Sequence, residues 1–147
     1  MATASTPDRD DPPETLTRLL RAELSAVETY RGALARLDGR AAGARLRQIC
    51  VDHSRAVQVL RGLLLRHGEA APASTAGREP IAEERGGDEL VATVHALRDH
   101  EARQVEAYRR ALADPALTPQ VKAMIRSDLL RRSEAHVPTL EAMLEAG

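Results

Sequence analysis

Hydrophobic side chains recur every three or four residues over four stretches of the chain. This spacing is typical of a helix that buries one face. It predicts four helices, over about 12–37, 40–67, 88–113 and 118–145. Gly39 and Gly68 follow the first two stretches, where glycine commonly ends a helix. Pro138 lies inside the fourth and predicts a kink, because proline lacks the backbone N–H that the helix would use.

The segments outside these helices differ in length. Residues 1–11 are polar and contain proline, so we expect a disordered tail, and order from residue 12 to residue 147. Residues 69–87 are rich in Ala, Pro, Gly and Glu without periodicity, which predicts a long connection. We therefore expect a single all-α domain, an antiparallel four-helix bundle of two helical hairpins joined by a long crossover.

Composition and charge exclude several classes of protein. The 21 basic and 22 acidic residues are interspersed, which is unlike the basic patch of a nucleic-acid-binding protein. No stretch approaches the roughly 20 apolar residues of a membrane span, and the N-terminus lacks the apolar segment of a secretory signal. The single cysteine, Cys50, suits a reducing compartment. We expect a soluble cytoplasmic protein that binds neither nucleic acid nor membrane.

The first and third predicted helices are similar to each other. Residues 23–34, ELSAVETYRGAL, align with residues 101–112, EARQVEAYRRAL, at seven identical positions out of twelve. The matches include two glutamates and the chain's two tyrosines, Tyr30 and Tyr108, which amphipathic composition alone does not explain. Self-similarity at a fixed offset indicates a duplicated hairpin.

Each predicted helix carries one polar residue among its hydrophobic positions. These residues are Glu23, His53, Glu101 and His136. An ionised carboxylate in an apolar interior costs several kcal/mol unless it is paired or bound to a metal. We therefore expect the four side chains to converge, where two carboxylates and two imidazoles could hold a cation.

The helix lengths place the first pair level and the second pair less well. Glu23 and His53 are each about 15 residues from the turn at 38–39, so an antiparallel hairpin brings them together. Glu101 is about 14 residues before Pro115, whereas His136 is about 21 after it. A wider loop at 114–118 or a kink at Pro138 would have to absorb this mismatch.

The segment LTRLLRAELSAVETY resembles the first-helix motif of bacterioferritin, and HVPTLEAML is similar to the run after that family's last ligand. Over residues 14–146 the chain resembles the ferritin-like superfamily, bacterioferritin and rubrerythrin in particular. The resemblance implies Glu23, His53, Glu101 and His136 as metal ligands. In that family a bridging glutamate precedes each histidine by three residues, but this chain has Cys50 and Ser133 there. The comparison therefore points to a degenerate site and away from a conventional di-iron centre with ferroxidase or peroxidase activity.

Two functions are compatible with these residues. The sequence favours a non-catalytic bundle in which Glu–His pairs fix the helix register, and which acts by association as a homo-oligomer, most simply a dimer. The alternative is a bundle that binds iron, manganese or zinc through Glu23, His53, Glu101 and His136, with Cys50 near enough to contribute. The sequence specifies no reaction, catalytic residue or organic cofactor.

Overall fold

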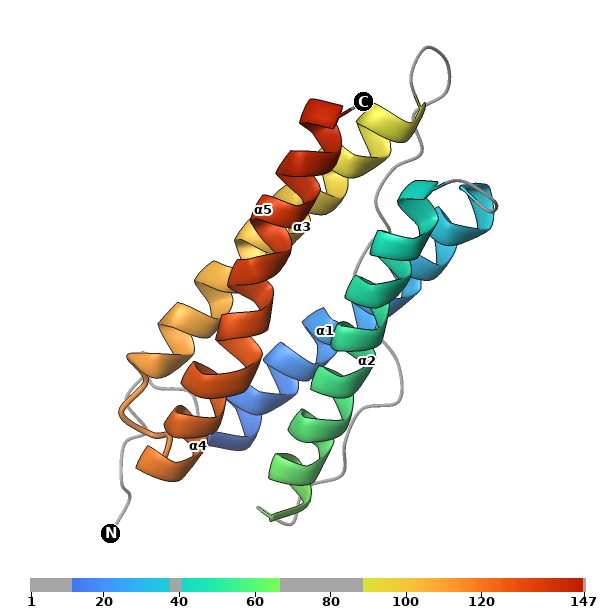
Figure 1. Ribbon diagram of the computed structural model, residues 1–147. Coiled ribbons are helices and arrows are strands. Elements are labelled where there is room, and N and C mark those ends of the chain that lie inside the picture. Colours follow the sequence, from blue (N-terminus) through green and yellow to red (C-terminus); the bar gives the residue numbers. More distant parts are fainter. Residues whose placement is uncertain (1–11, 38–40, 67–88, 147) are drawn as a thin grey trace, which may run out of the picture.

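The computed structural model describes residues 12–37, 41–66 and 89–146, and its regular elements within these ranges are all helical (Figure 1). They are α1 (Pro12–Arg36), α2 (Ala41–Arg66), α3 (Glu89–Leu112), α4 (Pro119–Met124), η1 (Ile125–Leu129) and α5 (Leu130–Ala146). Because α4, η1 and α5 are continuous, they make one long segment, and the described residues contain four such segments. The all-α prediction is confirmed. The predicted tail 1–11 and the connection 69–87 lie outside the described residues.

The four long segments pack in two pairs. The most extensive contacts are between α1 and α2 and between α3 and α5, which lie side by side in Figure 1. Smaller contacts join α1 to α3 and α2 to α5, so that the two pairs share one hydrophobic core. The largest apolar side chains that are fully buried there come from every segment: Leu16, Leu20, Leu46, Leu60, Leu64, Leu97, Ile125 and Leu140.

The turn between α3 and α4 is fixed by side-chain hydrogen bonds. Thr118 caps α4 by accepting a bond from the backbone N–H of Val121 at 3.2 Å, and Pro119 follows it at a position where proline loses no helical bond. Asp114 accepts a bond from the hydroxyl of Thr15 in α1 at 2.7 Å. This last bond ties the end of α3 to the first turns of α1.

The fourth segment departs from α-helical geometry at η1. There the N–H of Leu130 donates to the carbonyl of Ile125, five residues earlier, which gives a π-helical turn that holds an additional residue. Pro138, where the sequence predicts a kink, lies inside α5, and the helix continues on both sides of it. The observed irregularity therefore precedes His136, whereas Pro138 follows it.

No helix in the described ranges is long and apolar enough to cross a membrane. This agrees with the absence of long apolar stretches in the sequence.

Candidate metal centre

The four polar residues predicted to face the core are buried where the two helix pairs meet. Their exposed fractions are 1% for Glu23, 1% for His53, 0% for Glu101 and 5% for His136. They come from α1, α2, α3 and α5 respectively. Each is flanked at helical spacing by leucine, valine or isoleucine, and this places it on the same face as those core residues. Four titratable groups thus lie in the buried interior between the helix pairs.

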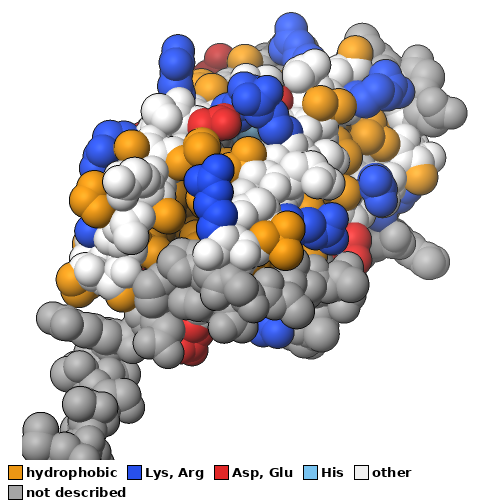
Figure 2. Space-filling view, turned by 90° about the horizontal axis from the view of Figure 1, so that it is seen from below, with side chains coloured by type: hydrophobic (Ala, Val, Ile, Leu, Met, Phe, Trp, Pro, Cys, Tyr) orange, Lys and Arg blue, Asp and Glu red, His pale blue; other side chains and the backbone are white. Residues whose placement is uncertain are grey.

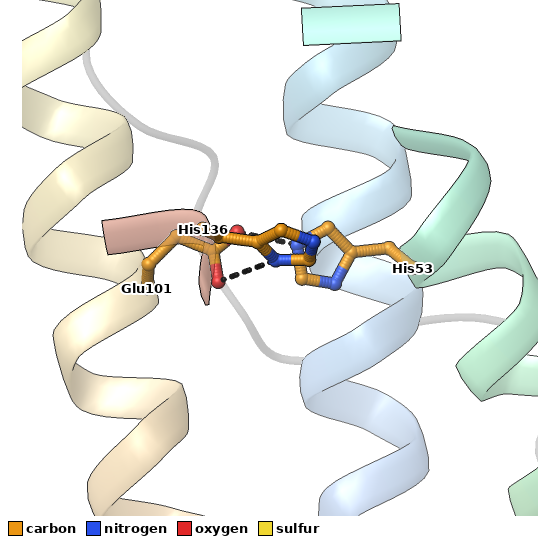
Figure 3. A group of neighbouring side chains, drawn as sticks. All are labelled: His53, Glu101 and His136. Carbon is orange, nitrogen blue, oxygen red and sulfur yellow. Dashed lines mark hydrogen bonds and ion pairs between the residues drawn. The ribbon is translucent and has the colours of Figure 1, made fainter. Parts of the chain in front are cut away.

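His53 lies between two carboxylates. Its Nδ1 is 2.6 Å from Oε2 of Glu23, and its Nε2 is 2.5 Å from Oε1 of Glu101 (Figure 3 shows the second contact). The first contact confirms that Glu23 and His53 are level. Both ring nitrogens can donate at once when the imidazole is protonated.

His136 also lies between two carboxylates, but one of them was not expected. Its Nδ1 faces Oε2 of Glu101 at 3.4 Å (Figure 3), and its Nε2 is 2.8 Å from Oδ2 of Asp52 in α2. Asp52 is in turn held by Arg132, whose Nη1 is 3.3 Å from Oδ1. Arg132 also donates to Asp128 of η1 at 2.6 Å, so the π-helical turn supports this outer layer.

The two tyrosines of the repeat complete the network by a reciprocal exchange. The hydroxyl of Tyr30 donates to Oε1 of Glu101 at 2.8 Å, and that of Tyr108 donates to Oε1 of Glu23 at 2.7 Å. The amide of Gln104 adds a bond to the same oxygen of Glu23 at 2.9 Å. Each repeat therefore supplies a hydrogen bond to the buried glutamate of the other.

The electrostatics of the centre follow from this geometry. Burial disfavours a charged His53, but the carboxylates of Glu23 and Glu101 outweigh it and raise the pKa of His53 well above its ordinary value. Burial alone would raise the pKa of Glu101, but His53 and His136 lower it far below the usual range. Burial and the nearby carboxylates raise the pKa of Tyr30, so its hydroxyl stays protonated as a donor. The metal-free centre thus holds ionised Glu101 beside cationic His53.

Three of these side chains could hold a metal ion. His53, Glu101 and His136 each offer one ligand atom, and these atoms all lie within 4.8 Å of one another (Figure 3). Each imidazole uses one nitrogen on an outer carboxylate, Glu23 or Asp52, and directs the other toward Glu101. A carboxylate that orients a histidine through its second nitrogen is a recurrent feature of protein metal sites.

Two residues predicted as ligands lie outside this group. Glu23 contacts the far nitrogen of His53, so its place is that of an orienting residue. Cys50 is buried, and burial raises the pKa of its thiol, which opposes the thiolate form that metals bind. Ser133 is buried as well. Cys50 and Ser133 stand three residues before His53 and His136, and neither side chain is a carboxylate.

The register mismatch of the second helix pair is resolved before His136. The connection from 113 to 118 is wider than a tight turn, and η1 places an additional residue in the helix. Glu101 and His136 then come within 3.4 Å. Of the two features that the sequence offered to absorb the mismatch, the wider loop is present, and η1 adds a residue that the sequence did not predict.

Asp52 could not be identified as a functional residue from its position in the sequence. It is adjacent to His53 and so points along another side of α2, and only the packing of α2 against α5 brings it to His136.

No protein-family description matches this chain, and neither a curated protein nor a solved structure shows significant similarity to it. The case for a function therefore comes from the site itself.

Proposed function

We propose that the chain is a ferritin-like bundle of two antiparallel helical hairpins that binds a single divalent transition-metal ion in its core. His53, Glu101 and His136 would be the ligands, and Glu23 and Asp52 would orient the two histidines. The observation that carries the proposal is the arrangement of the imidazoles, each held by an outer carboxylate while its other nitrogen faces Glu101. Two imidazoles and one carboxylate suit zinc, iron or manganese.

The cost of the buried groups supports this proposal. Removing four titratable side chains from water costs several kcal/mol per ion, and apolar residues of similar size would commonly be as stable or more stable. Strongly perturbed pKa values at such a cluster are characteristic of functional sites. With three protein ligands, coordination positions would remain for water or another small ligand.

A mononuclear site follows from the residues around the histidines. A dinuclear carboxylate centre needs a glutamate three residues before each histidine to bridge the ions. Cys50 and Ser133 occupy these positions, and neither belongs to the cluster of ligand atoms. We therefore expect one ion per chain.

The competing function is a non-catalytic bundle that works by association, as a homodimer, with the polar network fixing the helix register. This proposal is favoured by the hydrogen bonds, since Glu23 and Glu101 each accept three from the protein. Such a network is satisfied without any ion. The two functions differ in one measurable property, the stoichiometric binding of metal.

Metal content decides between them. The full chain is purified without chelators, loaded separately with Zn(II), Mn(II) or Fe(II), desalted and analysed by elemental mass spectrometry. We expect about one ion per chain, absent from a His53→Ala, His136→Ala double variant and retained by His95→Ala, which removes an exposed histidine of α3. A wild-type protein that retains no stoichiometric ion would favour the non-catalytic bundle.

A further inference from the structure

A pocket of about 530 Å³ lies between α1 and α3, beside the buried network and apart from the three candidate ligands. This volume is in the range of sites that bind small molecules. The side chain of Gln104 lines the pocket and also donates to Glu23. The pocket therefore adjoins the core network without including His53 or His136.

The charged residues of the pocket are mainly arginines. Arg18, Arg103 and Arg110 line it, and within the described residues Arg103 and Arg110 make no ion pair. Arg18 also lies 3.8 Å from the exposed Glu14. The two guanidinium groups of Arg103 and Arg110 at one cavity create a positive potential that attracts anions.

Little negative charge in the pocket offsets these arginines. Among the described lining residues, the acidic side chain is that of Asp114. Both of its oxygens are already occupied, since one accepts a bond from Thr15 at 2.7 Å and the other from the N–H of Ala116 at 2.9 Å. On the face of the molecule that Figure 2 shows, blue Lys and Arg side chains are more prominent than red Asp and Glu.

The internal repeat shows that these arginines are specific to one side of the molecule. At the matching positions of the first repeat, Arg103 is replaced by Ser25 and Arg110 by Gly32. Four of the five positions at which the two twelve-residue segments differ line this pocket on α3. The identical positions include the glutamates and tyrosines of the core network. Most of the positions at which the repeats differ thus line the pocket, whereas the shared glutamates and tyrosines build the core network.

The remaining lining offers an apolar surface. Leu19 and Ala22 of α1 face Ala107 and Ala111 of α3 across the cavity. The alanines are small, which leaves the space between the two helices. A ligand that fills this pocket would need an apolar part as well as a negative charge.

We infer that the pocket binds a small amphiphilic anion, a carboxylate or phosphate attached to a short apolar chain. Arg103 and Arg110 would bind the oxygens of the head group, because guanidinium groups match the geometry of carboxylate and phosphate. The apolar chain would lie against Leu19, Ala22 and Ala111. This site is independent of the proposed metal centre and would exist whether or not an ion binds there.

Isothermal titration calorimetry on the full chain tests this inference. The probes are octanoate and octyl phosphate, which share a chain and differ in head group, with 1-octanol and inorganic phosphate as single-feature controls. We expect one molecule of octanoate or octyl phosphate per chain, and binding of each control at least about tenfold weaker, because each lacks one of the two interactions. The head group that binds more tightly identifies the class of natural ligand.

Two variants of equal charge locate the site. Arg103→Ala with Arg110→Ala should weaken binding at least about tenfold, since two charge-assisted contacts are lost. Arg45→Ala with Arg47→Ala, on the exposed side of α2, should change the affinity for the anion less than about twofold. All four substituted residues are exposed, so both variants should fold, and circular dichroism checks this. Absence of binding by both anions, equal binding of 1-octanol, or equal loss in the two variants would overturn the inference.

Discussion

Tyr30 in α1 donates a hydrogen bond of 2.8 Å to Glu101 in α3, and so joins the two helix pairs through their buried interior. The equivalent residues of the other repeat make the same bond in return, from Tyr108 to Glu23 at 2.7 Å. Such reciprocal contacts are typical of two-fold symmetric interfaces between identical units. Here the relation holds between two halves of one chain, which explains why both tyrosines and both glutamates match in the repeat.

Each tyrosine hydroxyl should contribute measurably to stability. Tyr30→Phe and Tyr108→Phe each remove one donor from a buried carboxylate and leave packing nearly unchanged. We expect each to lower the free energy of unfolding by about 1.5–3 kcal/mol, the range for hydrogen bonds to charged groups. Urea denaturation followed by circular dichroism measures this. Losses below about 0.5 kcal/mol in both variants would show that the exchange is not stabilising.

Glu23 should be far more important for stability than an exposed glutamate of the same helix. Glu23→Ala leaves His53 with one carboxylate fewer and deprives Tyr108 and Gln104 of their acceptor. We expect a loss of about 3–5 kcal/mol, as when one partner of a buried pair is removed. Glu28→Ala, at an exposed position of α1, is the matched control and should stay within about 0.5 kcal/mol. Similar losses in both variants would contradict the assigned network.

The stability of the metal-free protein should depend on pH in two directions. The pKa of Glu101 is lowered by folding, so its contribution is present above about pH 4.3, the unfolded value, and is lost as the pH falls below it. The pKa of His53 is raised, so its contribution is complete below about pH 6.5 and is lost as the pH rises through the folded value. We therefore expect maximal stability between about pH 4.5 and 6.5.

Urea unfolding in the presence of a chelator, repeated from pH 3 to 10, checks this profile. The His53→Gln variant is the control, because it lacks the group that titrates on the alkaline side. In this variant the free energy of unfolding should decline much less above about pH 6.5 than in the wild type. An unchanged alkaline decline in this variant would assign the effect to other groups.

Asp52 should affect metal affinity although it is not a proposed ligand. Asp52→Asn removes the charge that orients His136, and we expect it to weaken Zn(II) binding about 10- to 100-fold while the protein stays folded. Competition with a chromophoric chelator measures the affinity. Asp99→Asn removes an equivalent charge from the exposed side of α3 and should have little effect. Equal affinity in wild type and Asp52→Asn would place the metal elsewhere.

The helices and the inward polar residues were predictable because both depend on local spacing. A period of three or four residues places Glu23 and His53 on the same faces as the leucines around them, and the expected contact between the two is present at 2.6 Å. No assumption about the second helix pair was needed for this contact. The sequence therefore specified the buried pair of α1 and α2 best.

The contacts of Asp52 and Gln104 were not predictable, because they depend on how the two helix pairs pack against each other. Asp52 reaches His136 only through the contact of α2 with α5, and Gln104 reaches Glu23 only through that of α3 with α1. The π-helical turn η1 has no strong sequence signal, since its residues suit a regular helix equally well. Pro138 was the more conspicuous feature, but α5 continues through it, and the departure from α-helical geometry lies earlier, at η1.

The position of a bound ion tests the metal proposal most directly. Crystals of the zinc-loaded protein, measured at the zinc absorption edge, would give an anomalous difference map. We expect one peak per chain, about 2.0–2.2 Å from Nε2 of His53, Nδ1 of His136 and a carboxylate oxygen of Glu101. A peak at any other set of side chains, or no peak in the core of a loaded protein, would contradict the proposed metal centre.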